Sequence, residues 1–67
     1  MDNRNIIFSV VYKDNFSEEY EIDEQELEVI LKEAENEESP HFHIGKKVFF
    51  KHEVALIATE SCSIQFI

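Results

Sequence analysis

Residues 22–34 read IDEQELEVILKEA and carry the most complete helix signature in the chain. Asp23 can accept hydrogen bonds from the first-turn amides as the N-cap, and Glu26, three residues later, completes a capping box. Apolar residues then recur at helical spacing on one face, at Leu27, Ile30, Leu31 and Ala34. Val29 lies off this stripe and is expected to be exposed. The stretch therefore predicts a helix with one face buried against another layer.

The helix is expected to end before residue 40. Asn36 is a suitable C-cap, and the Ser39-Pro40 pair prevents the helix from continuing. Glu28 and Lys32 stand four residues apart, a spacing at which opposite charges form a favourable pair on a helix.

The segment before the helix predicts a β-hairpin. Residues 5–13, NIIFSVVYK, and residues 16–22, FSEEYEI, are rich in β-branched and aromatic residues, and Asp14-Asn15 between them favours a turn. A three-residue loop at 14–16 would pair Val10 with Tyr20 and Phe8 with Ile22, which fits the hydrophobic pattern. A two-residue loop would instead place Val11 opposite Glu18 and bury a charge.

A second hairpin is expected after the helix, from residues 41–44 and 47–52 around Gly45-Lys46. Placing Ile44 opposite Val48 and Phe42 opposite Phe50 puts four apolar side chains on one face. The other face would then carry His41, His43, Phe49 and Lys51. Residues 54–59 read as a further strand, and residues 62–67 alternate as a short last one.

These segments predict an α+β fold in which residues 1–67 form a single small domain. We expect an antiparallel sheet of four to five strands with one helix packed on one face, in the order ββαβββ. One helix over one face of an antiparallel sheet buries the apolar surface of both.

The charge of the chain is strongly uneven. Its 67 residues have a formal net charge of −9. Residues 17–38 contain eleven acidic residues and one basic residue, whereas residues 39–52 contain three lysines and no acidic residue. Naked nucleic acid and anionic membranes are therefore poor partners for most of this surface.

The compartment is inferred from the rest of the composition. The one cysteine, Cys62, excludes an intramolecular disulfide and suits a reducing environment. No leader opens the sequence, and no apolar run approaches the length of a membrane span. We therefore expect a cytoplasmic protein, in the host cytoplasm if a phage encodes it.

The histidines suggest a metal site only weakly. A strand places His41 and His43 on the same face, and His52 could approach them from across the turn. Three lysines of the same hairpin would repel a dication, and only Glu53 stands nearby as a further ligand. We therefore predict no metal and no other cofactor, and keep a histidine-based metal-binding protein as an alternative.

No catalytic signature is present, so we predict that the protein is not an enzyme. Cys62 alternates with apolar residues and reads as a small buried hydrophobe. The single glycine cannot build a phosphate-binding loop. The second hairpin interleaves aromatic and basic residues, as single-strand binders do, but Phe49 is its one spare aromatic residue and the net charge opposes direct binding.

The acidic residues suggest a binding function. Carboxylates at helical spacing lie about 5–6 Å apart and can imitate a row of phosphates. We predict a small acidic, non-enzymatic protein-binding module that blocks a basic nucleic-acid-binding surface on a larger protein. Its profile is typical of phage or mobile-element inhibitors of a host enzyme or immune effector, of the DNA-mimic or anti-CRISPR type. The predicted partner-binding residues are Glu18, Glu19, Glu21, Glu24, Glu28, Val29 and Glu35.

The basic hairpin and the apolar sheet face offer further contacts. A secondary contact patch is predicted from His41, His43, Lys46, Lys47, Phe49 and Lys51. The alternative to the inhibitor is a homo-oligomeric structural or regulatory module. One helix cannot cover an apolar face formed by Ile7, Val11 and Ile67, so a symmetric homodimer could cover it.

Overall fold

The computed structural model describes residues 5–66. The elements follow the order β1 (Ile6–Tyr12), β2 (Ser17–Ile22), α1 (Glu24–Glu35), β3 (His41–Ile44), β4 (Lys47–Phe50), a 3₁₀ turn (Lys51–Glu53), β5 (Val54–Ala58) and β6 (Ser63–Gln65). The predicted α+β class is confirmed. All four strand segments predicted after the helix are present, so the order is ββαββββ and the predicted ββαβββ is one strand short.

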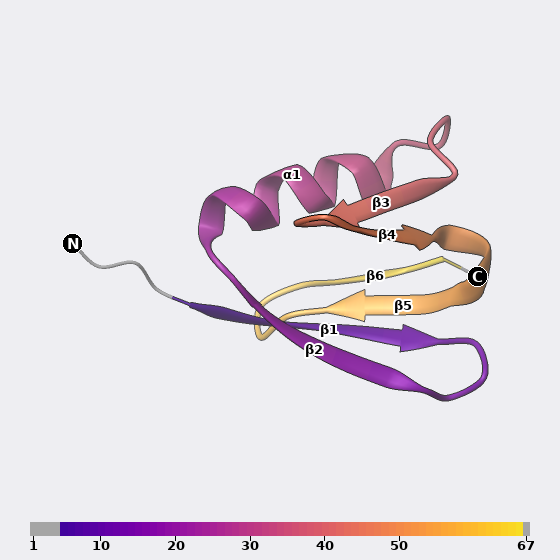
Figure 1. The fold of residues 1–67 in the computed structure, drawn as a ribbon, viewed down its shortest axis with the longest axis horizontal. Helices are drawn as coiled ribbons and strands as arrows, with labels where there is room; N and C mark the ends of the chain where they lie inside the picture. The colour runs from indigo at the N-terminus through magenta and orange to yellow at the C-terminus, as the bar shows by residue number, and fades with distance from the viewer. Residues whose placement is uncertain (1–4, 67) are drawn as a thin grey trace.

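The strands form two sheets instead of one. A four-stranded antiparallel sheet has the order β2-β1-β5-β6, and β3 and β4 form a separate two-stranded sheet. Helix α1 and the β3–β4 hairpin lie on the same side of the four-stranded sheet, and α1 packs against β3 (Figure 1). The opposite side of that sheet is not covered by any element between residues 5 and 66 (Figure 1).

The hydrophobic core lies between these layers. The four-stranded sheet contributes side chains that are at most 3% exposed: Phe8, Val10, Ile22, Val54 and Ile57. The helix contributes Ile30 and Ala34, and the hairpin contributes Phe42, Ile44 and Phe49. The Phe42 ring stacks on Phe49 and Phe66, with centroid distances of 5.3 and 5.8 Å.

The predicted signals at both ends of α1 are confirmed. The Glu26 amide donates to Asp23 Oδ1 at 2.8 Å, and the Asp23 amide donates to Glu26 Oε1 at 3.2 Å, which completes the capping box. Asn36 is the C-cap, and Val29 is 61% exposed. The predicted Glu28–Lys32 ion pair is not formed in the described structure.

The predicted pairing of the first hairpin is wrong by two residues. Phe8 lies opposite Tyr20 and Val10 opposite Glu18. The Tyr12 amide donates to the Phe16 carbonyl at 2.7 Å, so the loop has three residues, 13–15, and starts one residue earlier than expected. Asn15 has a φ of 76° and takes the left-handed position that closes such a loop. A shift of two residues keeps every side chain on its predicted face but brings Glu18 beside Val10.

The predicted pairing of the second hairpin is wrong by one residue. The turn residues are Gly45 and Lys46, so Ile44 pairs with Lys47 and Phe42 pairs with Phe49. Gly45 has a φ of 61°, which a two-residue hairpin turn requires at its first position.

A shift of one residue moves the side chains of one strand to the opposite face. Phe49 is therefore buried at 5% exposure, whereas Val48 and Phe50 are exposed at 46% and 45%. The prediction had Val48 and Phe50 in the core and Phe49 at the surface, and it is wrong for all three residues.

Strands β4 and β6 are shorter than expected. The predicted strand 47–52 ends at Phe50, because residues 51–53 form the 3₁₀ turn that leads into β5. Strand β6 covers Ser63–Gln65, and the predicted contribution of Ile67 lies outside the described residues. Within the described part of the chain, no helix has the length and apolarity needed to cross a membrane.

Candidate functional site

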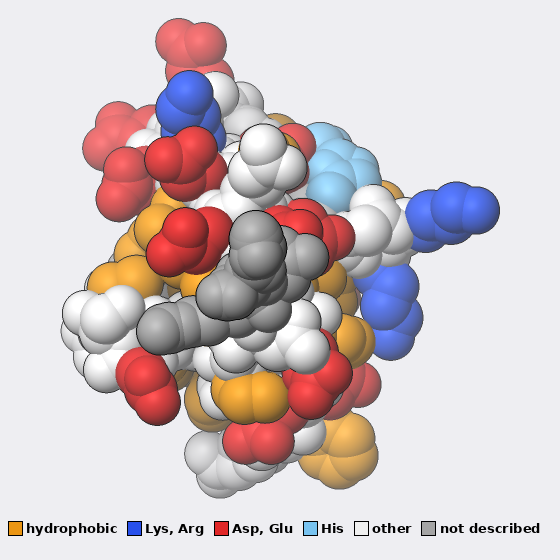
Figure 2. Space-filling view, turned by 90° about the vertical axis from the view of Figure 1, so that its left-hand side faces the viewer, with side chains coloured by type: hydrophobic (Ala, Val, Ile, Leu, Met, Phe, Trp, Pro, Cys, Tyr) orange, Lys and Arg blue, Asp and Glu red, His pale blue; other side chains and the backbone are white. Residues whose placement is uncertain are grey.

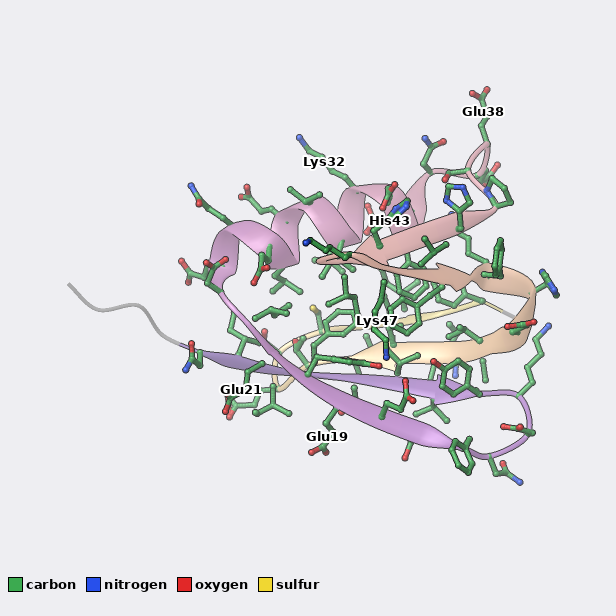
Figure 3. The ribbon with its side chains drawn as sticks, in the orientation of Figure 1. Glu19, Glu21, Lys32, Glu38, His43 and Lys47 are labelled. Carbon is green, nitrogen blue, oxygen red and sulfur yellow. The ribbon has the colours of Figure 1, made fainter. Side chains whose placement is uncertain are left out.

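The predicted partner-binding residues lie on three different surfaces. Glu19 and Glu21 lie on the uncovered face of the four-stranded sheet, and their side chains point away from the helix (Figure 3). Glu24, Glu28 and Glu35 lie on α1. Glu18 lies on the inner face of β2. The structure therefore does not bring the predicted set together as one surface.

The three helix carboxylates form a row of their own, the helix row (Glu24, Glu28 and Glu35). At about 100° per residue, they lie within an arc of about 40°, with axial spacings of about 6 and 10 Å. All three residues are exposed. In residues 5–66, none of them forms an ion pair with a lysine or a histidine. Val29 points about 100° away from Glu28 and lies outside the row.

Acidic side chains also surround the end of the molecule at which the helix begins. Figure 2 shows carboxylates distributed from the helix at the top to the sheet at the bottom of this end. Blue side chains project on the right, close to the histidines, and others lie among the carboxylates at the upper left (Figure 2). Glu24 of the helix row lines a depression with Glu60 and Ser61. The uneven charge of the sequence is therefore also uneven in space.

Glu18 is engaged by aromatic side chains on the inner face. The hydroxyl groups of Tyr12 and Tyr20 both donate to Glu18 Oε1, the first at 2.9 Å. These hydrogen bonds, from Tyr20 and then Tyr12, lower the pKa of Glu18 and outweigh the opposing effect of desolvation. Burial and then the bond to Glu18 raise the pKa of Tyr12 to about 12. The Glu18 carboxylate is therefore less available to a partner than those of the helix row.

Tyr20 also connects this network to the second hairpin. Lys47 Nζ donates to the Tyr20 hydroxyl at 3.2 Å and lies 5.3 Å from the centroid of its ring. The Tyr20 ring meets Phe49 edge-on, with centroids 5.8 Å apart.

Glu33 connects α1 to β3. Its Oε1 accepts from the His43 backbone amide at 2.9 Å, and both carboxylate oxygens lie 3.2 Å from His43 Nδ1. Burial raises the pKa of Glu33, but the hydrogen bonds from the His43 ring and amide, with the charges of His43 and His41, lower it further than burial raises it. The His41 and His43 ring centroids are 5.1 Å apart.

The predicted secondary contact patch is only partly at the surface. His41 and His43 lie on the outer face of the hairpin with Phe50, whose ring centroid is 6.1 Å from that of His41. Lys46 is exposed in the turn, and Lys51 Nζ donates to the Asn36 carbonyl at 2.7 Å. Phe49 is buried and does not belong to the patch, and Phe50 takes its place.

Sequence reasoning missed the contacts that join distant segments. Nothing in the spacing of the chain places Glu33 beside His43, ten residues later, because that contact depends on how α1 packs on β3. Nor did the strand pattern predict a role for the hydroxyl groups of Tyr12 and Tyr20, which both donate to Glu18. Cys62 is half-buried, and its Sγ lies 3.3 Å from Thr59 Oγ1.

Comparisons with known proteins return no match to any family model, curated protein or solved structure.

Proposed function

We propose that this protein is a non-enzymatic binding module that occupies the basic, nucleic-acid-binding surface of a larger protein. The observation that supports the proposal is the helix row, Glu24, Glu28 and Glu35. These exposed carboxylates follow one flank of a helix whose N-terminus is fixed by a capping box. Ordered carboxylates along one flank of a helix present negative charge to a surface that binds phosphates.

The proposed mode of action is competition. A module bound to a basic channel would exclude nucleic acid from it and would thereby inhibit the partner. The net charge of −9 would speed the encounter with a basic surface, and the binding should weaken as salt rises. We propose that the protein acts in the cytoplasm. We also propose that a phage or mobile element encodes it as an inhibitor, because its small size and acidic charge are typical of such inhibitors.

The contact surface in this proposal is narrower than the predicted set. Glu18 is left out because two tyrosine hydroxyls already bind its carboxylate. Glu19 and Glu21 are left out because they lie on the other side of the sheet from α1. The exposed residues of the β3–β4 hairpin would lie only at the edge of the contact between α1 and the partner.

The test is a capture experiment with a matched control. The protein is immobilised and exposed to a nuclease-treated bacterial lysate at low salt, and the retained proteins are identified by mass spectrometry. A variant with E24Q, E28Q and E35Q removes the helix row. A control variant with E19Q, E21Q and E38Q also removes three negative charges, all of them outside the helix row.

The proposal predicts that the wild type and the control retain the same nucleic-acid-handling protein, and that the helix-row variant loses it. Raising the salt should release it. Retention of no such protein by the wild type would contradict the proposal, as would equal losses in the two variants.

A second candidate function, homodimerisation, is supported by the uncovered face of the four-stranded sheet. Ile7 and Val11 lie on that face because the alternating Phe8 and Val10 are buried in the core. Cross-strand pairing adds Leu56 opposite Val11. Ile7 is 47% exposed. A second copy of the chain packed face to face would bury this apolar strip.

Sedimentation or light scattering over a range of concentrations tests this alternative. Ile7→Glu should shift the protein to a monomer, whereas Val29→Glu on the exposed side of the helix should not. A wild-type protein that is monomeric at micromolar concentration would exclude the dimer.

A further inference from the structure

The outer face of the second hairpin brings three metal-ligating side chains together. Glu33, His41 and His43 each offer one ligand atom, and these atoms all lie within 4.8 Å of one another. Glu33 Oε2 is already 3.2 Å from His43 Nδ1. In a tetrahedral zinc site with ligand distances of about 2.0–2.1 Å, neighbouring ligand atoms are about 3.3 Å apart. One pair therefore already has the required spacing, and the third ligand must move by at most about 1.5 Å.

The unpaired ring nitrogen of His41 is a second, independent observation that supports a bound ligand. Its Nδ1 is buried and has no hydrogen-bond partner in the described structure. A buried polar atom without a partner is rare in folded proteins, and a water or an ion that completes the site is one explanation for it. A cation coordinated by this nitrogen would give the imidazole the partner that the described residues do not supply.

Two of the three hairpin lysines, Lys47 and Lys51, have contacts of their own in the fold. Lys47 is directed toward the four-stranded sheet, where its Nζ donates to Tyr20 (Figure 3). Lys51 Nζ donates to the Asn36 carbonyl at the end of α1. The packing of α1 on β3 also brings the negative charge of Glu33 to the two histidines.

We propose that Glu33, His41 and His43 form a binding site for a divalent transition-metal cation, for which Zn²⁺ is the best match. Two imidazoles and one carboxylate are a known zinc ligand set, and they leave a fourth position for water. The side chains of His43 and Glu33 are 42% and 32% exposed, so an ion can enter without unfolding the protein. The hairpin already contributes Phe42, Ile44 and Phe49 to the hydrophobic core, so the proposal does not require the metal for folding. A bound ion would join α1 to β3.

The site can be tested by zinc titration of the purified full chain. Binding is measured at neutral pH by calorimetry and by competition with a chromophoric chelator. The wild type should bind one Zn²⁺ per chain. His41→Gln should weaken the binding at least tenfold, because it removes one of three protein ligands. His52→Gln is the matched control, since His52 lies next to Glu53 outside the cluster and should leave the affinity unchanged within twofold.

His41→Gln is the decisive variant because it leaves the Glu33–His43 contact in place. Circular dichroism and thermal melting without metal establish that each variant is folded. Tetrahedral Co²⁺ substituted for Zn²⁺ should give an intense visible spectrum in the wild type and in His52→Gln, and not in His41→Gln. The proposal is overturned if the folded wild type binds no stoichiometric Zn²⁺, if folded His41→Gln binds as tightly as the wild type, or if His52→Gln loses as much affinity.

Discussion

The two strands of the β3–β4 hairpin are attached to the rest of the molecule by different chemistry. On the β4 side, Lys47 and Phe49 both contact Tyr20 of β2. On the β3 side, His43 contacts Glu33 of α1 through its backbone amide and its ring. Beneath both sides, Phe42 stacks on Phe49. Apolar burial thus holds the hairpin in place, while the polar contacts make its two sides respond to different conditions.

The largest effect should come from Phe49, whose ring contacts Tyr20 and stacks on Phe42. Phe49→Ala removes a ring that is 5% exposed and should destabilise the protein by about 3–5 kcal/mol. Phe50→Ala, the same substitution one residue later at 45% exposure, should cost less than about 1 kcal/mol. Urea denaturation followed by circular dichroism measures both changes. Equal losses, or a larger loss for Phe50→Ala, would mean that the hairpin register is wrong.

The contrast between these two residues shows where sequence reasoning reaches its limit. The start of α1 could be predicted because the capping box joins Asp23 and Glu26 within four residues. The faces of β4 could not, because Phe49 and Phe50 are adjacent and identical. Their assignment depends on one residue of register, which the two-residue turn at Gly45 decides.

The candidate sites show the same limit. The acidity of α1 and the HxH pair of β3 are visible in the sequence, since both are local patterns. The contact of Glu33 with His43 forms only when α1 packs against β3, so spacing alone cannot reveal it. The separation of Glu19 from the helix row likewise follows from the layer arrangement and not from composition.

The next largest loss of stability is expected from a substitution on the β3 side of the hairpin. Glu33→Gln should destabilise the protein by about 1 kcal/mol, since it weakens a partly exposed charged hydrogen bond to His43. Glu35→Gln, an exposed carboxylate of the same helix, should have almost no effect. Thermal melting at neutral pH compares the two variants, and a loss no greater than that of Glu35→Gln would show that the contact contributes nothing.

The lowered pKa of Glu33 predicts that the stability of the protein depends on pH in the acidic range. The pKa of Glu33 is lower in the folded protein than its ordinary value. Its contribution to stability is therefore present above the unfolded pKa, about 4.3, and is lost as the pH falls through the folded pKa. Between about pH 6 and 3, the melting temperature should fall less for Glu33→Gln than for the wild type. An equal fall in melting temperature in the two proteins would show that Glu33 is not the source of this pH dependence.

The network of Tyr12, Glu18 and Tyr20, to which the β4 side is attached through Tyr20, should respond at the opposite end of the pH scale. The pKa of Tyr12 is raised from 10.0 to about 12, first by burial and then by its bond to Glu18. Its contribution is present below the unfolded pKa and is lost as the pH rises through the folded pKa, over about pH 10–12. Tyr12→Phe should therefore have a small effect at neutral pH and should reduce the alkaline loss of stability. Melting between about pH 8 and 12 tests this, and an unchanged alkaline loss would exclude Tyr12 as its source.

The smallest effect is expected from the ammonium group of Lys47. Lys47→Met keeps an apolar stem that can lie over the Tyr20 ring and removes only the charge and its hydrogen bond. Because the group is exposed, the melting temperature should fall less than in Glu33→Gln, and the difference should disappear at high salt. Lys46→Met, in the exposed turn, is the matched control for the loss of one positive charge. A loss in Lys47→Met as large as that in Glu33→Gln, and unaffected by salt, would reverse the comparison. The polar contact on the β4 side would then stabilise the hairpin as much as the contact between Glu33 and His43, although water surrounds it.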